Sequence, residues 1–320
     1  MNWKLLAGRL RGAWLEYPET RRRIASIPAG PPIFLTGTHR SGTTWLAKML
    51  AAPGIWYIHE PFSPEKGRWP KSFDYRRSEV ADADVDALFD EVLSGGFRAA
   101  LNMPNADYPM MPLRLFKPRL KRMLIKDPLG CLLTEYLTTR YQLQTVILFR
   151  HPAGFVSSVR RLGWPLGSFL RQFLDDGQLM TEHLEPHRNL LEKYSGEDSV
   201  ESAAVLHGAL NTVLWSYVKQ GVGSHVMFED LCQDPINKLQ GLFEVLQLPY
   251  DERTREIHQR ACFGDVMSVE KYHPHAVSRN SMAMARSWAG KIASDELTLI
   301  REIWQQFGIP LYDRDEDWTP

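Results

Sequence analysis

Residues 33–50 constrain the fold of this chain more than any other stretch. An apolar run, residues 33–35, enters a polar loop that two glycines bracket, and helix-forming residues follow directly. Gly37 and Gly42 allow the backbone to turn tightly and to approach an anion. The first amides of the following helix point at such an anion with the helix dipole behind them. The stretch therefore predicts a buried strand, a phosphate-binding loop and a helix, in an α/β fold.

The loop has the spacing of a nucleotide-binding P-loop, with one displaced charge. Thr43 stands where a nucleotide triphosphatase needs Lys, and the basic residue, Arg40, lies two places before the second glycine. A P-loop kinase also needs a strand-end Asp for magnesium, and the later apolar run 145–149 ends in Arg150 instead. The pattern argues against ATP or GTP chemistry. The alternative to a phosphate-binding role is a glycine turn that only leads into a buried helix.

The run 145–149 predicts a second buried strand that ends in a basic loop and opens another helix. Arg150 follows this strand, and Ser158 lies eight residues further on. An Arg fork suits a phosphate dianion, and a hydroxyl on the first helical turns can complete the site. A strand-end Arg paired with a carboxylate, together with a capping Ser, is the alternative.

At these two loops the chain resembles sulfotransferases, whose donor is 3'-phosphoadenosine 5'-phosphosulfate (PAPS). The resemblance covers residues 33–160 by motif and the rest by architecture. It implies that Arg150 and Ser158 bind the 3'-phosphate, and that Arg40 stabilises the leaving phosphate. The residues implied to hold the 5'-phosphosulfate are Thr38, His39, Arg40, Ser41, Gly42, Thr43, Thr44 and Trp45.

Three further residues are candidates for chemistry. His59 and Glu60 follow the predicted strand 55–58, and ligands lie at the carboxyl ends of such strands. By the resemblance, a Glu or His here takes the proton of an acceptor hydroxyl. We favour Glu60 as the base, because the Glu-Pro sequence after this strand is similar to that of the carbohydrate and tyrosyl-protein branches of the family. His59 is the alternative base. A His-Glu pair that only caps the loop is the alternative without a catalytic role. Lys126-Asp127 ends strand 122–126, and the resemblance gives Lys126 a transition-state role; a turn-fixing Lys-Asp pair is the alternative.

Later in the chain, the family has a basic loop that folds over the 3'-phosphate and the adenine. The resemblance points to Arg279, Arg286 and Lys291, although the Arg-Lys-Gly signature of the cytosolic small-molecule branch is absent.

We expect one three-layer α/β domain over residues 1–320, with the P-loop-like sulfotransferase fold and a central parallel sheet of about five strands. The strands should begin near residues 33, 55, 122, 145 and 225, and a strand ending in Glu-Asp-Leu is expected at 225–231. Helices are expected at 84–93, 129–142, most of 153–220, 236–246, 251–259 and 295–307.

Two stretches are less regular. Residues 63–121 carry many prolines and two basic-aromatic patches, 68–77 and 114–122, which suit either an acceptor site or a solvated loop. Within residues 1–30, positions 2–17 predict an amphipathic basic helix. It would either pack on its own domain or make a peripheral membrane or partner contact.

Composition limits the function. Lys and Arg number 38, as do Asp and Glu, so the chain is not a general nucleic-acid binder. Three scattered cysteines predict reduced thiols and a cytoplasmic location. No apolar run is long enough to span a membrane, whereas the Golgi members of the family carry an N-terminal anchor. His273 and His275 lack the partners of a metal site.

We therefore predict a sulfotransferase that moves a sulfuryl group from PAPS to an acceptor hydroxyl without a metal. A saccharide or glycoconjugate is the favoured acceptor. A lipid, phenolic or peptide hydroxyl, a catalytically silent PAPS-binding protein and a P-loop kinase stay open as alternatives.

Overall fold

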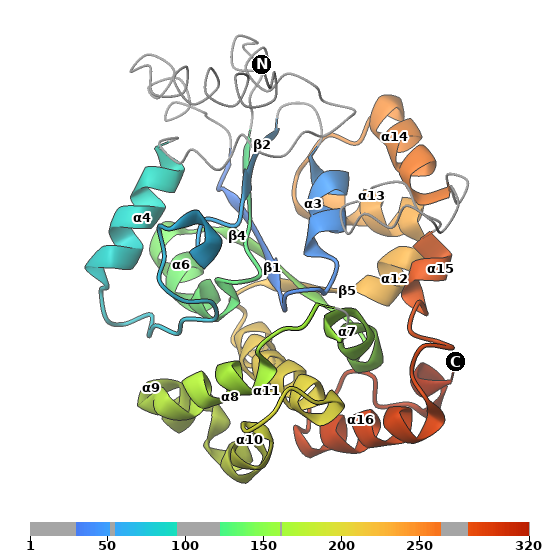
Figure 1. Cartoon of the computed structure of the whole chain (residues 1–320). Coiled ribbons are helices and arrows are strands. Elements are labelled where there is room, and N and C mark those ends of the chain that lie inside the picture. Colours follow the sequence, from blue (N-terminus) through green and yellow to red (C-terminus); the bar gives the residue numbers. More distant parts are fainter. Residues whose placement is uncertain (1–29, 52–54, 95–121, 161, 264–280, 320) are drawn as a thin grey trace, which may run out of the picture. The chain divides into compact units, whose positions relative to one another are not determined.

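The computed structural model describes residues 30–51, 55–94, 122–160, 162–263 and 281–319 (Figure 1). Five strands form one parallel sheet in the order β2-β3-β1-β4-β5. Each begins within one residue of the predicted position, so the predicted α/β fold is confirmed. The strands are β1 (Ile33–Gly37), β2 (Ile55–His59), β3 (Arg122–Lys126), β4 (Gln144–Phe149) and β5 (Ser224–Met227).

The register of the first strands places candidate residues together. β3 pairs in parallel with both β1 and β2. His59 at the end of β2 is opposite Lys126 at the end of β3, and Lys126 is also opposite Leu35 of β1. β1 and β3 are buried along their whole length, and each has three successive apolar residues, 33–35 and 123–125, before a polar residue.

Helices account for most of the remaining described residues. The longer ones are α3 (Thr43–Leu50), α4 (Ala83–Leu93), α6 (Thr134–Tyr141), α7 (Pro152–Val159), α8 (Leu166–Asp175), α10 (Arg188–Tyr194), α11 (Val200–Lys219), α12 (Phe228–Gln233), α13 (Pro235–Val245), α14 (Glu252–Phe263), α15 (Ser281–Ala285) and α16 (Ser294–Gln306). Shorter turns are η1 (Pro64–Lys66), η3 (Cys131–Leu133), α9 (Gly177–Leu179), η4 (Met180–Leu184), η5 (Glu185–His187) and η7 (Asp315–Trp318). Within the described residues, no helix is both long and apolar enough to cross a lipid bilayer.

Two boundaries differ from the sequence expectations. The strand expected at 225–231 ends at Met227, and α12 begins at Phe228. Glu229 and Asp230 lie in the first turn of that helix, where its dipole favours carboxylates. The helix expected at 129–142 begins as the 3-10 turn η3 and becomes α-helical at Thr134.

The chain divides into two compact units. The first contains residues up to Thr36 together with 44–146, and the second contains Gly37–Thr43 together with 147–320. The loop Gly37–Thr43 therefore belongs with the Arg150 strand end, whereas Glu60 and Lys126 belong to the first unit.

The first unit has an aromatic core beside β1, β2 and β3. Phe34, Ile58, Phe62, Phe89 and Tyr136 are all fully buried members of one cluster. Helix α4 contributes one apolar face to it, and its N-terminus is capped by the carboxylate of Asp82, which accepts from two backbone amides of the first turn.

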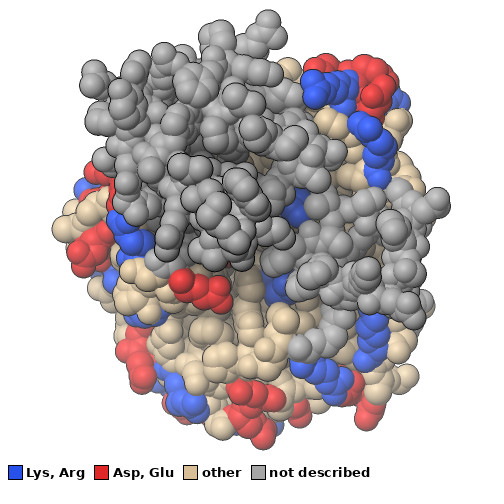
Figure 2. Space-filling model, turned by 45° about the horizontal axis from the view of Figure 1, so that its top comes forward, with Lys and Arg blue, Asp and Glu red and all other residues tan. Residues whose placement is uncertain are grey.

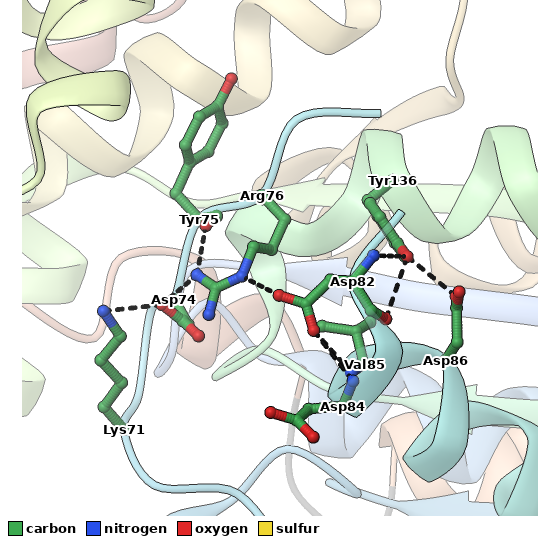
Figure 3. A network of polar contacts seen from close by, with 9 residues as sticks. All are labelled: Lys71, Asp74, Tyr75, Arg76, Asp82, Asp84, Val85, Asp86 and Tyr136. Atoms are coloured by element: carbon green, nitrogen blue, oxygen red, sulfur yellow. Dashed lines mark hydrogen bonds and ion pairs between the residues drawn. The ribbon is translucent and has the colours of Figure 1, made fainter. Parts of the chain in front are cut away.

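A polar network holds the segment before α4 in place (Figure 3). The Asp74 carboxylate is 1% exposed and accepts from Lys71 Nζ and Arg76 Nη1, each at 2.8 Å. Arg76 also pairs with Asp82. The Tyr136 hydroxyl of α6 accepts from the Asp82 amide at 2.8 Å and donates to Asp86 Oδ1. The network therefore joins the segment to α4 and α6.

We predict that Asp74→Ala lowers the free energy of unfolding by about 1–3 kcal/mol, because Arg76 and Lys71 lose a buried carboxylate. Chemical denaturation measures the change. Asp315→Ala is the control, since Asp315 is 94% exposed in its pair with Arg301 and its removal should leave stability unaltered. Equal effects would contradict a structural role for the network.

Candidate active site

The loop Gly37–Thr43 of the second unit depends on its two glycines. Gly37 has a φ of +145°, and a Cβ there would lie 2.3 Å from the Leu148 carbonyl oxygen. Gly42 has a φ of +103°, and a Cβ there would lie 2.5 Å from the Phe228 ring. The Ser41 amide donates to the Thr38 carbonyl at 3.0 Å and closes the turn. Any side chain at either glycine would push the loop out of place.

The structure brings Arg40, Arg150 and Ser158 together. Arg40 Nε donates to Ser158 Oγ at 3.0 Å, and Arg150 Nη1 donates to the Arg40 carbonyl at 2.6 Å. The Arg150 guanidinium also lies over the Phe228 ring, 4.9 Å from its centre. Two guanidinium groups and a hydroxyl of α7 thus meet beyond the end of β4, and guanidinium and hydroxyl donors suit a phosphate.

The late basic loop reaches this cluster through a residue that sequence reasoning missed. Ser287 Oγ accepts from Arg150 Nη2 at 3.4 Å. Of the predicted residues, Arg286 donates to the Thr319 carbonyl and Lys291 donates to the Ser287 carbonyl. Arg279 lies outside the described residues. Ser287 follows Arg286 and belongs to no recognisable sequence motif, so no signal in the sequence marks it.

His151, next to Arg150, is buried among aromatic rings. Its ring stacks on Trp288 with centroids 4.9 Å apart, and Trp318 approaches edge-on at 4.5 Å. Its Nδ1 accepts from the Ala153 amide and caps α7. The backbone amide of His151 donates to Glu229, a carboxylate that also accepts from Tyr312. Burial lowers the pKa of His151 to about 3, so the ring is neutral.

In the first unit, Glu60 and Lys126 form an ion pair at the ends of β2 and β3. Lys126 is fully buried, and its Nζ also donates to Thr44 Oγ1 at 3.1 Å. The Glu60 amide donates to the Lys126 carbonyl at 2.7 Å. Lys126 thus pairs with the carboxylate that follows the neighbouring strand β2.

Asp127 holds the turn that carries Glu60. Its carboxylate accepts from the amides of Phe62 at 2.6 Å and of Leu129 and Gly130 at 2.9 Å. Burial and the charge of Glu60 raise the pKa of Asp127 to about 6, while the amide donors act in the opposite direction. The group is therefore ionised at neutral pH.

A tyrosine that the sequence did not mark lies beside His59. Tyr57 Oη lies 2.8 Å from His59 Nδ1, and burial raises the pKa of Tyr57 well above its usual value, so the phenol keeps its proton. On the other side of the ring, His59 Nε2 lies 3.5 Å from Glu60 Oε2. Both ring nitrogens are engaged.

The other loop residues are mostly buried. His39 stacks on Trp164 with ring centroids 4.3 Å apart and an angle of 4°. Thr38, Ser41, Thr43 and Trp45 are buried.

The basic-aromatic patch 68–77 is largely neutralised. Arg68 pairs with Glu91, and Lys71 and Arg76 pair with carboxylates of the Figure 3 network. On the face shown in Figure 2, acidic and basic side chains of the described residues are interspersed. The patch thus gives no support for an anionic acceptor. Residues 114–121, His273, His275 and the N-terminal stretch 1–29 lie outside the described residues.

Comparison with known protein families gives the class of this chain. Residues 31–252 match the sulfotransferase family, so the chain belongs to that family, and the predicted enzyme class is confirmed. Sulfuryl transfer is therefore its class of reaction. No curated protein matches the chain.

Among solved structures, the chain is similar to the sulfotransferase domain from the curacin biosynthetic pathway, with 17% identity, a TM-score of 0.46 and coverage of 88% of this chain and 99% of that one. It is also similar to mouse sulfotransferase SULT7A1 complexed with PAP, with 14% identity, a TM-score of 0.42 and coverage of 95% and 93%.

We predict that acid selectively destabilises the protein through His151 and His207, a buried residue of α11 whose pKa burial also lowers to about 3. Unfolding restores a pKa near 6.5, so the unfolded state binds more protons below that pH, and stability falls as the pH drops. Each histidine should remove about 2 kcal/mol between pH 7 and pH 5.

Urea titrations at a series of pH values measure this effect. Asp127 acts with the opposite sign, because its pKa is raised on folding. The comparison of wild type with His151→Phe therefore isolates one histidine: the variant should lose stability less steeply between pH 7 and pH 5. Parallel curves would contradict the prediction.

Proposed function

We propose that this protein transfers the sulfuryl group of PAPS to an acceptor hydroxyl. The cluster of Arg40, Ser158 and Arg150 is the observation that carries the proposal. It joins a phosphate loop to a second basic strand end, and PAPS carries phosphate groups at two positions of one ribose. Generic nucleotide binding would need only the first of these sites.

The donor is held through charge and amide contacts. The loop 37–43 and Arg40 bind the 5'-phosphosulfate, while Arg150 and Ser158 bind the 3'-phosphate, with Ser287 beside them. The acceptor oxygen attacks sulfur as the bond to the 5'-phosphate oxygen breaks, and 3',5'-ADP leaves. Positive charge on Arg40 and the helix dipole of α3 stabilise the leaving phosphate.

Glu60 is the base in this mechanism. His59 lies between two polar neighbours, with Tyr57 Oη 2.8 Å from Nδ1 and Glu60 Oε2 3.5 Å from Nε2, so both of its ring nitrogens already have a partner. Glu60 has a carboxylate in an ion pair with Lys126. We propose that the sulfuryl oxygens compete for the Lys126 ammonium in the transition state, which leaves Glu60 to take the acceptor proton.

The acceptor we propose is a hydroxyl of a saccharide or glycoconjugate. The proposal rests on Glu60-Pro61, which resembles the Glu-Pro of the carbohydrate branch of the family. Lipid, phenolic and peptide hydroxyls are the classes against which labelled PAPS should be screened. Cys131, Cys232 and Cys262 are free and buried, which supports a reducing compartment such as the cytoplasm.

Recognition of the 3'-phosphate is the first test of this function. We predict that 3',5'-ADP raises the melting temperature clearly more than 5'-AMP at the same concentration, because only the former reaches Arg150. Thermal shift and titration calorimetry measure the difference. Arg150→Ala should weaken 3',5'-ADP binding by about 2–5 kcal/mol and 5'-AMP binding by less, because Arg150 also holds the Arg40 carbonyl of the loop 37–43. Equal shifts by both nucleotides in the wild type would remove the PAPS assignment.

The base is tested by a change that keeps shape but removes basicity. Glu60→Gln should lower kcat by two or more orders of magnitude, while affinity for 3',5'-ADP changes little. The measurement is transfer of label from PAPS to the acceptor class found in the screen. His59→Gln is the matched variant and should cost less, through positioning alone. If Glu60→Gln kept near-full activity and His59→Gln were inactive, His59 would be the base and Glu60 the positioning residue.

A further inference from the structure

We propose that His207 is a positioning residue that ties the loop 37–43 to the end of β4, so that both phosphates of the donor meet a preformed site. The inference rests on the proposed PAPS donor. It assigns a role to α11, a helix that the sequence pattern predicts only as a packed element.

One imidazole ring joins two distant stretches of chain. His207 is fully buried, and its Nε2 lies 2.9 Å from the Arg150 carbonyl oxygen. A carbonyl can only accept, so Nε2 carries the proton. Because the ring is neutral, Nδ1 keeps its lone pair and accepts from Thr38 Oγ1 at 3.4 Å. Thr38 begins the turn of the phosphate loop, and Arg150 is the strand-end cation.

Aromatic packing fixes the direction of both hydrogen bonds. Phe155 of α7 stacks on the His207 ring with centroids 4.3 Å apart and an angle of 21°. Trp304 of α16 lies near the same ring at 5.6 Å and 29°. Rotation of the ring would lose these contacts, so Nδ1 and Nε2 keep their partners. His207 therefore acts through Thr38 and Arg150, one residue from each of the two proposed phosphate sites.

The arrangement matters most for a ligand with two phosphates. Such a ligand needs both loops in place at once, and it must order them on binding if nothing holds them together. A ligand with a single 5'-phosphate contacts only one loop, so its affinity should fall less when the two loops are no longer held together. The loss of His207 should therefore reduce the advantage that the 3'-phosphate confers, rather than weaken every nucleotide equally.

The test uses the full chain with His207→Phe, which keeps a ring of similar size between Phe155 and Trp304 but removes both hydrogen bonds. Titration calorimetry with 3',5'-ADP and 5'-AMP should show an about tenfold or greater loss for the first and less than about threefold for the second. His258→Phe is the matched control. His258 is also a buried histidine, with its Nδ1 3.2 Å from the Tyr250 hydroxyl. Its loss should leave the ratio of the two affinities unchanged.

Amide hydrogen exchange without nucleotide separates this role from the donor assignment. In His207→Phe, amides of 38–43 and 150–153 should exchange faster, and they should not in His258→Phe. Thr38→Val, a milder change, should speed exchange in the loop, and Thr38→Ser should restore it. Unchanged exchange, or an equal affinity loss for both nucleotides, would overturn the proposal. Faster exchange in a protein whose wild type binds neither nucleotide would reject the PAPS donor and retain the positioning role.

Discussion

The second unit depends on the close approach of the loop 37–43 to the end of β4. Gly37 lies so near the Leu148 carbonyl that no Cβ fits, and the Arg150 guanidinium bonds the Arg40 carbonyl. This backbone contact sets where the Arg40 side chain begins and lets it reach Ser158. Every contact of the proposed phosphate cluster follows from it, because Arg150, Phe228 and α7 pack around the same loop.

Two of the proposed functional residues have an unusual backbone. Arg40 has a φ of +70° and Glu60 a φ of +49°, in the left-handed region that costs a residue with a Cβ about 1–2 kcal/mol. The surroundings hold both conformations. The Arg40 carbonyl is bound by Arg150, and the Glu60 turn is held by the Lys126 carbonyl and the Asp127 carboxylate. In each case a polar contact from another strand end maintains the strained residue.

Buried polar groups in both units are kept in one protonation state. His151 and His207 are neutral because burial lowers the pKa of each, and Tyr57 stays protonated because burial raises its pKa. Other polar groups form ion pairs or bind phosphate-loop carbonyls, as in the Lys126–Glu60 pair and the contact of Arg150 with the Arg40 carbonyl. A neutral imidazole has one donor and one acceptor, so a buried neutral histidine can bind a carbonyl on one side and a hydroxyl donor on the other. A charged histidine has two donors and cannot accept.

The sequence by itself determined the sheet and the loop, and it predicted most of the proposed site residues, because these depend on local patterns. Apolar runs mark the buried strands, glycines mark the tight turn, and strand ends mark where Glu60, Lys126 and Arg150 stand. It misjudged the end of β5, where Glu229 and Asp230 lie in the first turn of α12 instead of ending the strand. Only the tertiary structure decided that Ser158 meets Arg40, that Lys126 pairs with Glu60, and that Tyr57, His207 and Ser287 support the site. These contacts join residues up to 169 positions apart, and no local pattern carries the packing that brings them together.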